Sequence, residues 1–169
     1  MRKVTEDYSP EISRQKLDAR FAQNPVVADR VKKMTKTQLS VFAALCDGKS
    51  FTTAGYSIDA DYGVNRASAV ALSLEKRHSI PVSRRMIETK ADVGGNTKQA
   101  LFFISSEDLN RLDDEPETLF KECQLDLFRR TSSQAQRDVK RLLRELGTDG
   151  LLNLVHAAND GTAPEQNAG

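Results

Sequence analysis

Apolar residues recur with helical spacing in two segments near the middle of the chain. The first segment, over residues 35–47, carries them at i, i+3, i+4 and i+7: Leu39, Phe42, Ala43 and Cys46. The second segment, over residues 65–77, repeats that stripe: Ala67, Val70, Ala71 and Leu74. Gly48 follows the first segment where a left-handed cap belongs, and Asn65 opens the second as an N-cap. Both segments are predicted to be amphipathic helices, with Cys46 in the core.

Weaker helical signals flank the first of these helices. Residues 10–22 are weakly amphipathic, and Asn24-Pro25 matches an N-cap followed by proline at the first helical position, for a second short helix over 24–33. The turn-rich stretch after Gly48 holds a small apolar set, so a short helix is predicted over 57–62, ended by a glycine.

The periodicity changes after residue 80. Residues 84–90 place two apolar residues among polar ones, a Gly-Gly-Asn turn follows, and residues 100–105 (ALFFIS) form an apolar segment rich in β-formers. Two strands around a glycine turn predict a β-hairpin. Three helices followed by a hairpin is the order of a winged helix. The predicted fold class is therefore mainly α with a small β-hairpin: a winged helix-turn-helix core with helical N- and C-terminal extensions.

The acidic run DDEPE at 113–117 is predicted to mark a boundary. Beyond it, helices are expected over 117–130 and 133–146, the second stopped by Gly147, and a final short helix follows. The Gly/Pro/Asn/Ala-rich tail is expected to be disordered. The predicted organisation is an N-terminal helical extension (1–33), a winged helix-turn-helix (34–106), a C-terminal helical segment (107–157) and a tail (158–169).

Charge is unevenly distributed, although the net charge is only +1. Residues 1–36 carry nine Lys/Arg against five Asp/Glu, residues 37–106 carry eight against six, and residues 107–169 carry eight against thirteen. The front of the chain is therefore basic and its back acidic. The apolar fraction of 38%, with no Trp, fits a modest core.

Sites for covalent catalysis or metal binding find little support. Cys46 and Cys123 lie far apart without CxxC spacing and are predicted to be buried, reduced thiols. His78 and His156 have no cysteine or carboxylate pattern beside them and are predicted to be surface or packing residues. The acids at 113–117 lack the spacing and glycine of a calcium loop, which favours a solvated linker. We therefore expect no enzyme activity, no metal, no cofactor and no small-molecule substrate.

Neither a membrane span nor a leader is expected. No apolar run approaches the ~20 residues of a transmembrane helix, and no charged-then-apolar leader opens the chain. A cytoplasmic location is the prediction.

The helix from Asn65 and the hairpin carry the side chains best suited to binding duplex DNA. A recognition helix needs an apolar face for the core and short or basic side chains on the other face, so that it can approach base edges. The helix offers Asn65, Arg66, Ser68, Ala69, Ser73 and Lys76. The helix end and hairpin add cations suited to phosphates: Arg77, Arg84, Arg85, Lys90 and Lys98.

We expect Arg66 to pair with guanine, Asn65 either to pair with adenine or only to cap the helix, and Ser68 and Ser73 to face bases. From Arg66 to Lys98, seven basic residues stand against three acids. An amphipathic helix with a few exposed cations is also typical of an ordinary solvated face.

Part of this region also resembles a known family. The strings DADYGVNRASAV (59–70) and LEKRHSIPV (74–82) are similar to the small helix-turn-helix family common in phages and prophages. Its members show a glycine turn, an arginine and alanines opening the second motif helix, a leucine-basic pair, a turn, and a hairpin ending in an aromatic strand. The resemblance, over about residues 34–106, implies a winged helix-turn-helix protein that binds double-stranded DNA. Three features depart from the family pattern: His78-Ser79 in place of a glycine turn, an inserted segment at 54–57 and a long hairpin loop.

Two functions from different classes are compatible with these observations. The first is a DNA-binding transcriptional regulator or accessory factor of a phage or other mobile element. The alternative is a protein-interaction module built on a winged helix, whose acidic C-terminal helices engage a basic partner or imitate nucleic acid. The dense aliphatic set within 142–155 either packs on the winged helix or forms a homodimer interface, and we expect the homodimer.

Overall fold

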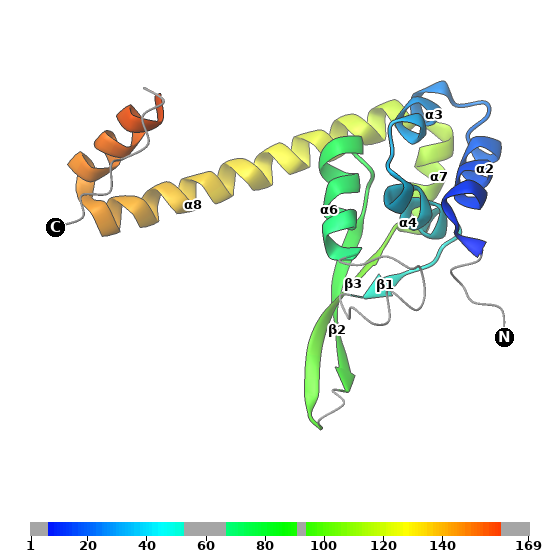
Figure 1. Cartoon of the computed structure of the whole chain (residues 1–169), viewed down its shortest axis with the longest axis horizontal. Helices are drawn as coiled ribbons and strands as arrows, with labels where there is room; N and C mark the ends of the chain where they lie inside the picture. Colours follow the sequence, from blue (N-terminus) through cyan, green and yellow to red (C-terminus); the bar gives the residue numbers. More distant parts are fainter. Residues whose placement is uncertain (1–6, 53–66, 91–93, 160–169) are drawn as a thin grey trace. The chain divides into compact units, whose positions relative to one another are not determined.

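The structure of the chain is a computed structural model that describes residues 7–52, 67–90 and 94–159 (Figure 1). The predicted mainly helical fold with a small antiparallel sheet is confirmed. The predicted helix over 57–62 and the tail from residue 160 lie outside the described residues. The elements follow in the order α2 (Pro10–Arg20), α3 (Pro25–Lys32), α4 (Lys36–Cys46), β1 (Phe51–Thr52), α6 (Ala67–His78), β2 (Ser83–Lys90), β3 (Asn96–Phe103), α7 (Ser106–Asp114) and α8 (Pro116–Asn159).

A short polar residue followed by proline begins each N-terminal helix. Ser9 Oγ accepts a hydrogen bond from the N–H of Ile12 at the start of α2. Asn24 Oδ1 accepts one from the N–H of Val27 at the start of α3. The first N–H groups of a helix lack intrahelical partners, and proline has no N–H to leave unsatisfied, so both starts are fixed locally. The predicted helices over 10–22 and 24–33 are confirmed.

The central helix of the first unit is α4. Thr35 Oγ1 accepts from the N–H of Gln38 while Gln38 Oε1 accepts from the N–H of Thr35, which forms a capping box. Gly48, with φ of 73°, follows the helix as predicted. Burial extends over every residue from Gln38 to Cys46, because α4 contacts both α2 and α6. The prediction of a single buried face was therefore too narrow.

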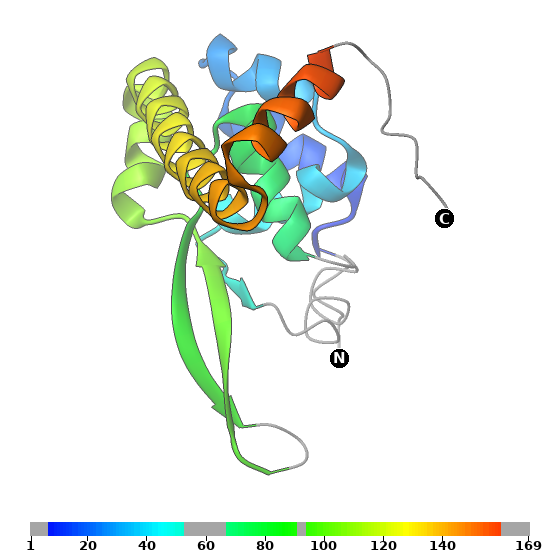
Figure 2. The same cartoon turned by 90° about the vertical axis from the view of Figure 1, so that its left-hand side faces the viewer.

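The predicted hairpin is confirmed, but its second strand spans Asn96–Phe103 rather than 100–105, so the loop is shorter than expected. The sheet also gains a third strand. β2 and β3 pair antiparallel from Ser83↔Phe103 to Lys90↔Asn96. β1, which was not predicted, pairs with β3, so the strand order is β1-β3-β2. Phe51 of β1 stacks on Phe102 of β3 with ring centroids 5.3 Å apart, which anchors the base of the hairpin to the core. The remainder of the hairpin extends away from the helices of its unit (Figures 1 and 2).

The acidic run at 113–117 is not the linker that was predicted. Asp113 and Asp114 end α7, a helix absent from the prediction, and Pro116 and Glu117 begin α8. The acids are exposed, but Glu115 also forms an ion pair with Arg111, at 2.6 Å. The sequence did not indicate this helix, because its residues are mostly polar and only Leu112 is a fully buried apolar side chain.

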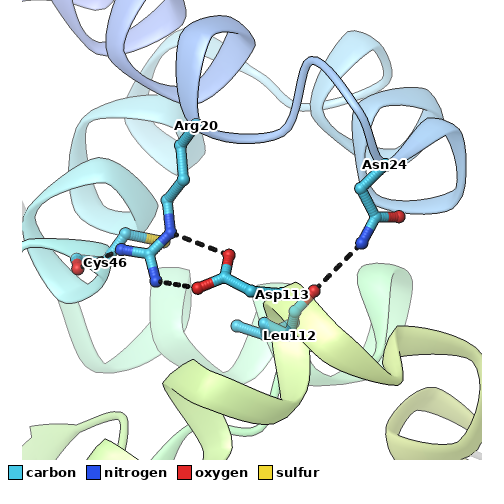
Figure 3. A network of polar contacts seen from close by, with 5 residues as sticks. All are labelled: Arg20, Asn24, Cys46, Leu112 and Asp113. Carbon is cyan, nitrogen blue, oxygen red and sulfur yellow. Dashed lines mark hydrogen bonds and ion pairs between the residues drawn. The ribbon is translucent and has the colours of Figure 1, made fainter.

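Polar contacts tie α7 to the N-terminal helices (Figure 3). Arg20 Nε and Nη2 donate to the two carboxylate oxygens of Asp113, at 3.2 and 2.8 Å, and Nη1 donates to the carbonyl of Cys46 at 2.7 Å. Asn24 Nδ2 donates to the carbonyl of Leu112 at 3.1 Å. Arg20 and Asn24 thereby satisfy carbonyls at the ends of α4 and α7 that have no partner within their own helices.

The chain divides into two compact units, residues 1–125 and 126–169. The core of the first unit combines the N-terminal helices, the central region and the start of α8: Tyr8, Leu17, Phe21, Phe42, Leu74, Ile80, Leu112, Leu119 and Phe120 are all buried there. Residues 7–33 and 107–125, expected to flank the central region as extensions, thus share its core. Cys46 is buried as predicted, whereas Cys123, also predicted to be buried, is only half-buried at the edge of this core.

The second unit consists of the remainder of α8. The helices predicted over 117–130 and 133–146 form one continuous helix. Between them, Thr131 Oγ1 donates to the carbonyl of Leu127 at 2.8 Å, so its hydroxyl is satisfied inside the helix. Gly147, with φ of 71° and ψ of 177°, interrupts the helix as predicted, and a further helical segment continues to Asn159. No helix in the described ranges is long and apolar enough to cross a membrane.

Candidate nucleic-acid interface

The two sides of α6 differ in exposure and in chemistry. Ala71, Leu74 and His78 are 2%, 0% and 6% exposed and face the core. With 3.6 residues per turn, the opposite side of the helix carries exposed residues: Ser68, Ala69, Leu72, Lys76 and Arg77. The outward side therefore combines small side chains, one leucine and cations near the C-terminal end.

Ser73 takes a position different from the outward one expected of it. It is half-buried, and its Oγ accepts a hydrogen bond of 2.6 Å from Gln38 Nε2 of α4. This contact places Ser73 on the flank of α6 that meets α4. Its hydroxyl therefore holds α6 on α4 and is already engaged.

The packing residue His78 belongs to the same polar group. Its Nε2 lies 3.3 Å from Gln38 Oε1, and because an amide oxygen only accepts, Nε2 carries the proton in this contact. Burial, followed by the positive charges of Arg30, Arg77 and Lys33, lowers the pKa of His78. His78 therefore favours the neutral form, as a structural residue between α4 and α6.

The turn from α6 into the hairpin has a serine in a left-handed conformation. Ser79 has φ of 56°, the only positive φ of a non-glycine residue in the described part of the chain. This conformation lets the N–H of Ile80 donate back to the carbonyl of Leu74 at 3.2 Å. Ser79 Oγ accepts from Gln124 Nε2 at 3.1 Å. The turn thus orients the hairpin relative to α6.

The hairpin places cations on both of its faces. Arg84 and Arg85 are adjacent in β2 and both are exposed, so their side chains project to opposite sides of the strand. The guanidinium of Arg85 lies 5.8 Å from the ring centroid of Phe103. Lys98 is exposed on β3, directly opposite Glu88.

The cations of α6 and the hairpin differ from several others in the first unit. Lys16, Arg20 and Arg111 form ion pairs with carboxylates at 2.6–2.9 Å. Among the residues that the structure describes, no carboxylate pairs with the five exposed cations of the interface: Lys76, Arg77, Arg84, Arg85 and Lys98. None of the five therefore forms an ion pair within the described part of the protein, although Lys98 lies opposite Glu88 across the ladder.

Sequence reasoning missed two further cations near the end of α6. Arg30 of α3 donates from Nε to the carbonyl of His78 at 2.9 Å, and its guanidinium lies 3.9 Å from the ring centroid of Phe120. Lys33, exposed after α3, is close enough for its charge to lower the pKa of His78. Lys32, Lys33 and Lys36 lie close together in the sequence, but the position of Lys33 near His78 depends on long-range packing.

The structure does not describe the side chains of three of the expected DNA-binding residues. Asn65, Arg66 and the side chain of Lys90 lie outside the described residues. Ser68, Ala69, Lys76, Arg77, Arg84, Arg85 and Lys98 are exposed on α6 and the hairpin of the first unit. No cluster of three or more His, Cys, Asp or Glu side chains suited to a metal ion occurs among the residues described.

Comparisons of the chain with known protein families, with curated proteins and with solved structures found no match.

Proposed function

We propose that this protein binds duplex DNA through a winged helix-turn-helix, as a regulator or accessory factor of the phage or mobile-element kind that its sequence resembles. In this proposal α4 and α6 belong to the motif, α6 is the recognition helix, and β2–β3 is the wing. The observation that carries the proposal is the set of five exposed cations on α6 and the hairpin without carboxylate partners in the described part of the chain.

The outward side of α6 fits the major groove in size. Ser68 and Ala69 are small and exposed near the start of the helix, which allows the backbone to come close to base edges. Lys76 and Arg77 lie near its other end, where they can contact phosphates. Base readout by Asn65 and Arg66 remains part of the proposal.

The hairpin supports contacts beyond the groove that α6 occupies. Each of its strands has eight residues, so the ribbon is about 27 Å long at ~3.4 Å per residue. Arg84 and Arg85 are exposed on opposite faces near its base, and Lys98 lies farther out. Contacts of this kind give affinity without sequence information, because each cation neutralises a phosphate.

Binding to a fluorescent random duplex, followed by anisotropy at low salt, tests the proposal. Lys76→Ala and the double variant Arg84→Ala/Arg85→Ala should each weaken binding. Arg14→Ala is the matched control for a single lost charge. Arg14 lies on α2, which is not part of the proposed interface and packs chiefly on α4. Equal affinity of the wild type, the control and both interface variants would refute the assignment of this surface to DNA.

A protein-interaction function is the second candidate, favoured by two exposed apolar side chains on the elements of the proposed interface. Leu72 on α6 is 47% exposed and Met86 on β2 is 63% exposed. Large exposed apolar side chains beside cations also suit a protein partner. Failure of the wild type to bind any duplex at low salt would leave this candidate in place of the first.

A homodimer completes the proposal. Two copies of a recognition helix read two half-sites, and this supplies affinity that a single small module lacks. The C-terminal helices are the proposed site of that association.

A further inference from the structure

A regular apolar stripe follows the helix of the second unit before Gly147. Six residues recur with alternating spacings of four and three: Phe128, Ser132, Ala135, Val139, Leu142 and Leu146. This is the heptad spacing of the two inward positions of a coiled coil. Nine of the 21 residues over 126–146 are charged, and none of those charges falls on the stripe.

Within the second unit, much of this stripe is exposed. Phe128 is 71% exposed, Val139 45% and Leu146 49%, and the flanking Leu143 is 39% exposed. Most of the stability of a protein helix comes from packing of its apolar face rather than from intrinsic helix propensity. A helix with this pattern therefore gains stability when another helix covers the stripe.

We propose that the stripe packs against the same stripe of a second copy of this chain, as a two-helix coiled coil. A hydrophobic repeat of 3.5 residues keeps one seam facing a partner helix that has the same repeat. A second copy of the chain carries a stripe with the same spacing and the same length. Two-fold pairing covers both stripes at once and leaves no further stripe to propagate association.

The exposed apolar surface supplies a large part of the area that this pairing needs. At roughly 200 Å² for a fully exposed large side chain, the exposed fractions of Phe128, Val139, Leu143 and Leu146 leave on the order of 400 Å² per copy. Two copies supply about 800 Å² from these residues alone, toward the ~1,200–2,000 Å² of a stable interface. The second helical segment adds apolar side chains that are 46–49% exposed: Leu152, Leu154 and Val155.

The two small residues of the stripe are compatible with pairing. Ser132 and Ala135 are small, so the two helices can approach closely at that level. Two ion pairs lie within each helix, Arg129 with Asp126 and Arg141 with Asp138, at 3.3 and 3.5 Å. The assignment of this surface rests on the homodimer proposed above, but it does not depend on DNA binding.

The molar mass of the full chain, measured by light scattering during size exclusion at about 100 µM and without DNA, tests the inference. We expect the wild type to elute with twice the 18.8 kDa of one chain. Val139→Glu should elute as a monomer. Ser133→Glu adds the same charge beside the stripe, at an exposed position outside the heptad seam, and should remain a dimer.

Circular dichroism and a second variant guard against a folding defect. Glutamate is a good helix former and Val139 is already 45% exposed, so Val139→Glu should retain the helix content of the monomer. Phe128→Ala removes the most exposed of the large apolar side chains of the stripe without adding charge, and it should raise the dimer dissociation constant at least tenfold. A monomeric wild type, or dimerisation of both stripe variants at wild-type strength, would overturn the inference. Because DNA is absent, these outcomes leave the test of DNA binding separate.

Discussion

Replacing Ser79 tests whether the turn between α6 and the hairpin is held in a left-handed conformation. Ser79 has φ of 56° and is 5% exposed. That conformation costs a non-glycine residue about 1–2 kcal/mol, whereas glycine adopts it freely. At an ordinary helical position the order is reversed, because glycine is less stable than alanine by about 0.5–1 kcal/mol.

Comparing Ser79→Gly with Ser79→Ala isolates this backbone effect. Both substitutions remove the hydroxyl that accepts from Gln124, so the loss of that hydrogen bond cancels in the comparison. The relief of about 1–2 kcal/mol exceeds the entropic disadvantage of glycine. Ser79→Gly should therefore be more stable than Ser79→Ala by on the order of 0.5–1 kcal/mol.

Equilibrium urea unfolding measures this difference. Ala28→Gly, inside α3, is the control, and it should lower the free energy of unfolding by about 0.5–1 kcal/mol relative to the wild type. A Ser79→Ala variant as stable as Ser79→Gly, or more stable, would show that residue 79 is not left-handed in solution.

Three further predictions concern the interior of the first unit. The free energy of unfolding should fall as the pH drops below about 6.5, because His78 binds a proton more readily in the unfolded chain than in the folded protein, where its pKa is lowered. His78→Gln should remove this pH-dependent component, and identical pH profiles of the wild type and the variant would contradict the prediction. Burial raises the pKa of Cys46 to about 12, so a thiol reagent should label the half-buried Cys123 in the native protein but Cys46 only on unfolding, and Cys123→Ser should abolish the fast phase. Arg20→Ala should lower the free energy of unfolding by about 1–3 kcal/mol, because the carbonyl of Cys46 and the carboxylate of Asp113 lose their donor. If urea unfolding gave the same free energy for the variant and the wild type, these contacts would not contribute to stability.

Features encoded by neighbouring residues were predictable from the sequence. Asn24-Pro25, Gly48 and Gly147 were predicted as helix starts and ends, and each acts within a few residues. The Ser9-Pro10 start and the Thr35–Gln38 capping box act over equally short distances but were not singled out. The hairpin was also recognisable, because its glycine turn and apolar strand are contiguous. These elements depend little on the rest of the fold.

Features that depend on distant packing were missed. β1 has two residues, too few to show alternation, and it forms only because β3 offers Phe102 as a partner for Phe51. Leu109 and Leu112 are the two apolar residues of α7, too few for a helical stripe that the sequence could reveal, and Arg20 and Asn24 hold the end of the helix. In the candidate site, the engagement of Ser73 by Gln38 and the approach of Lys33 to α6 are likewise contacts between elements far apart in sequence.

The salt dependence of duplex binding tests most directly whether the cations of α6 and the hairpin contact phosphates. Each such contact adds about 0.9 to the slope of the logarithm of affinity against the logarithm of salt concentration. Lys76→Ala/Arg84→Ala/Arg85→Ala removes three cations, so the slope should become shallower by about 2.7 per protomer, while Arg14→Ala should leave it unchanged. A slope equal to that of the wild type in the triple variant would contradict the account.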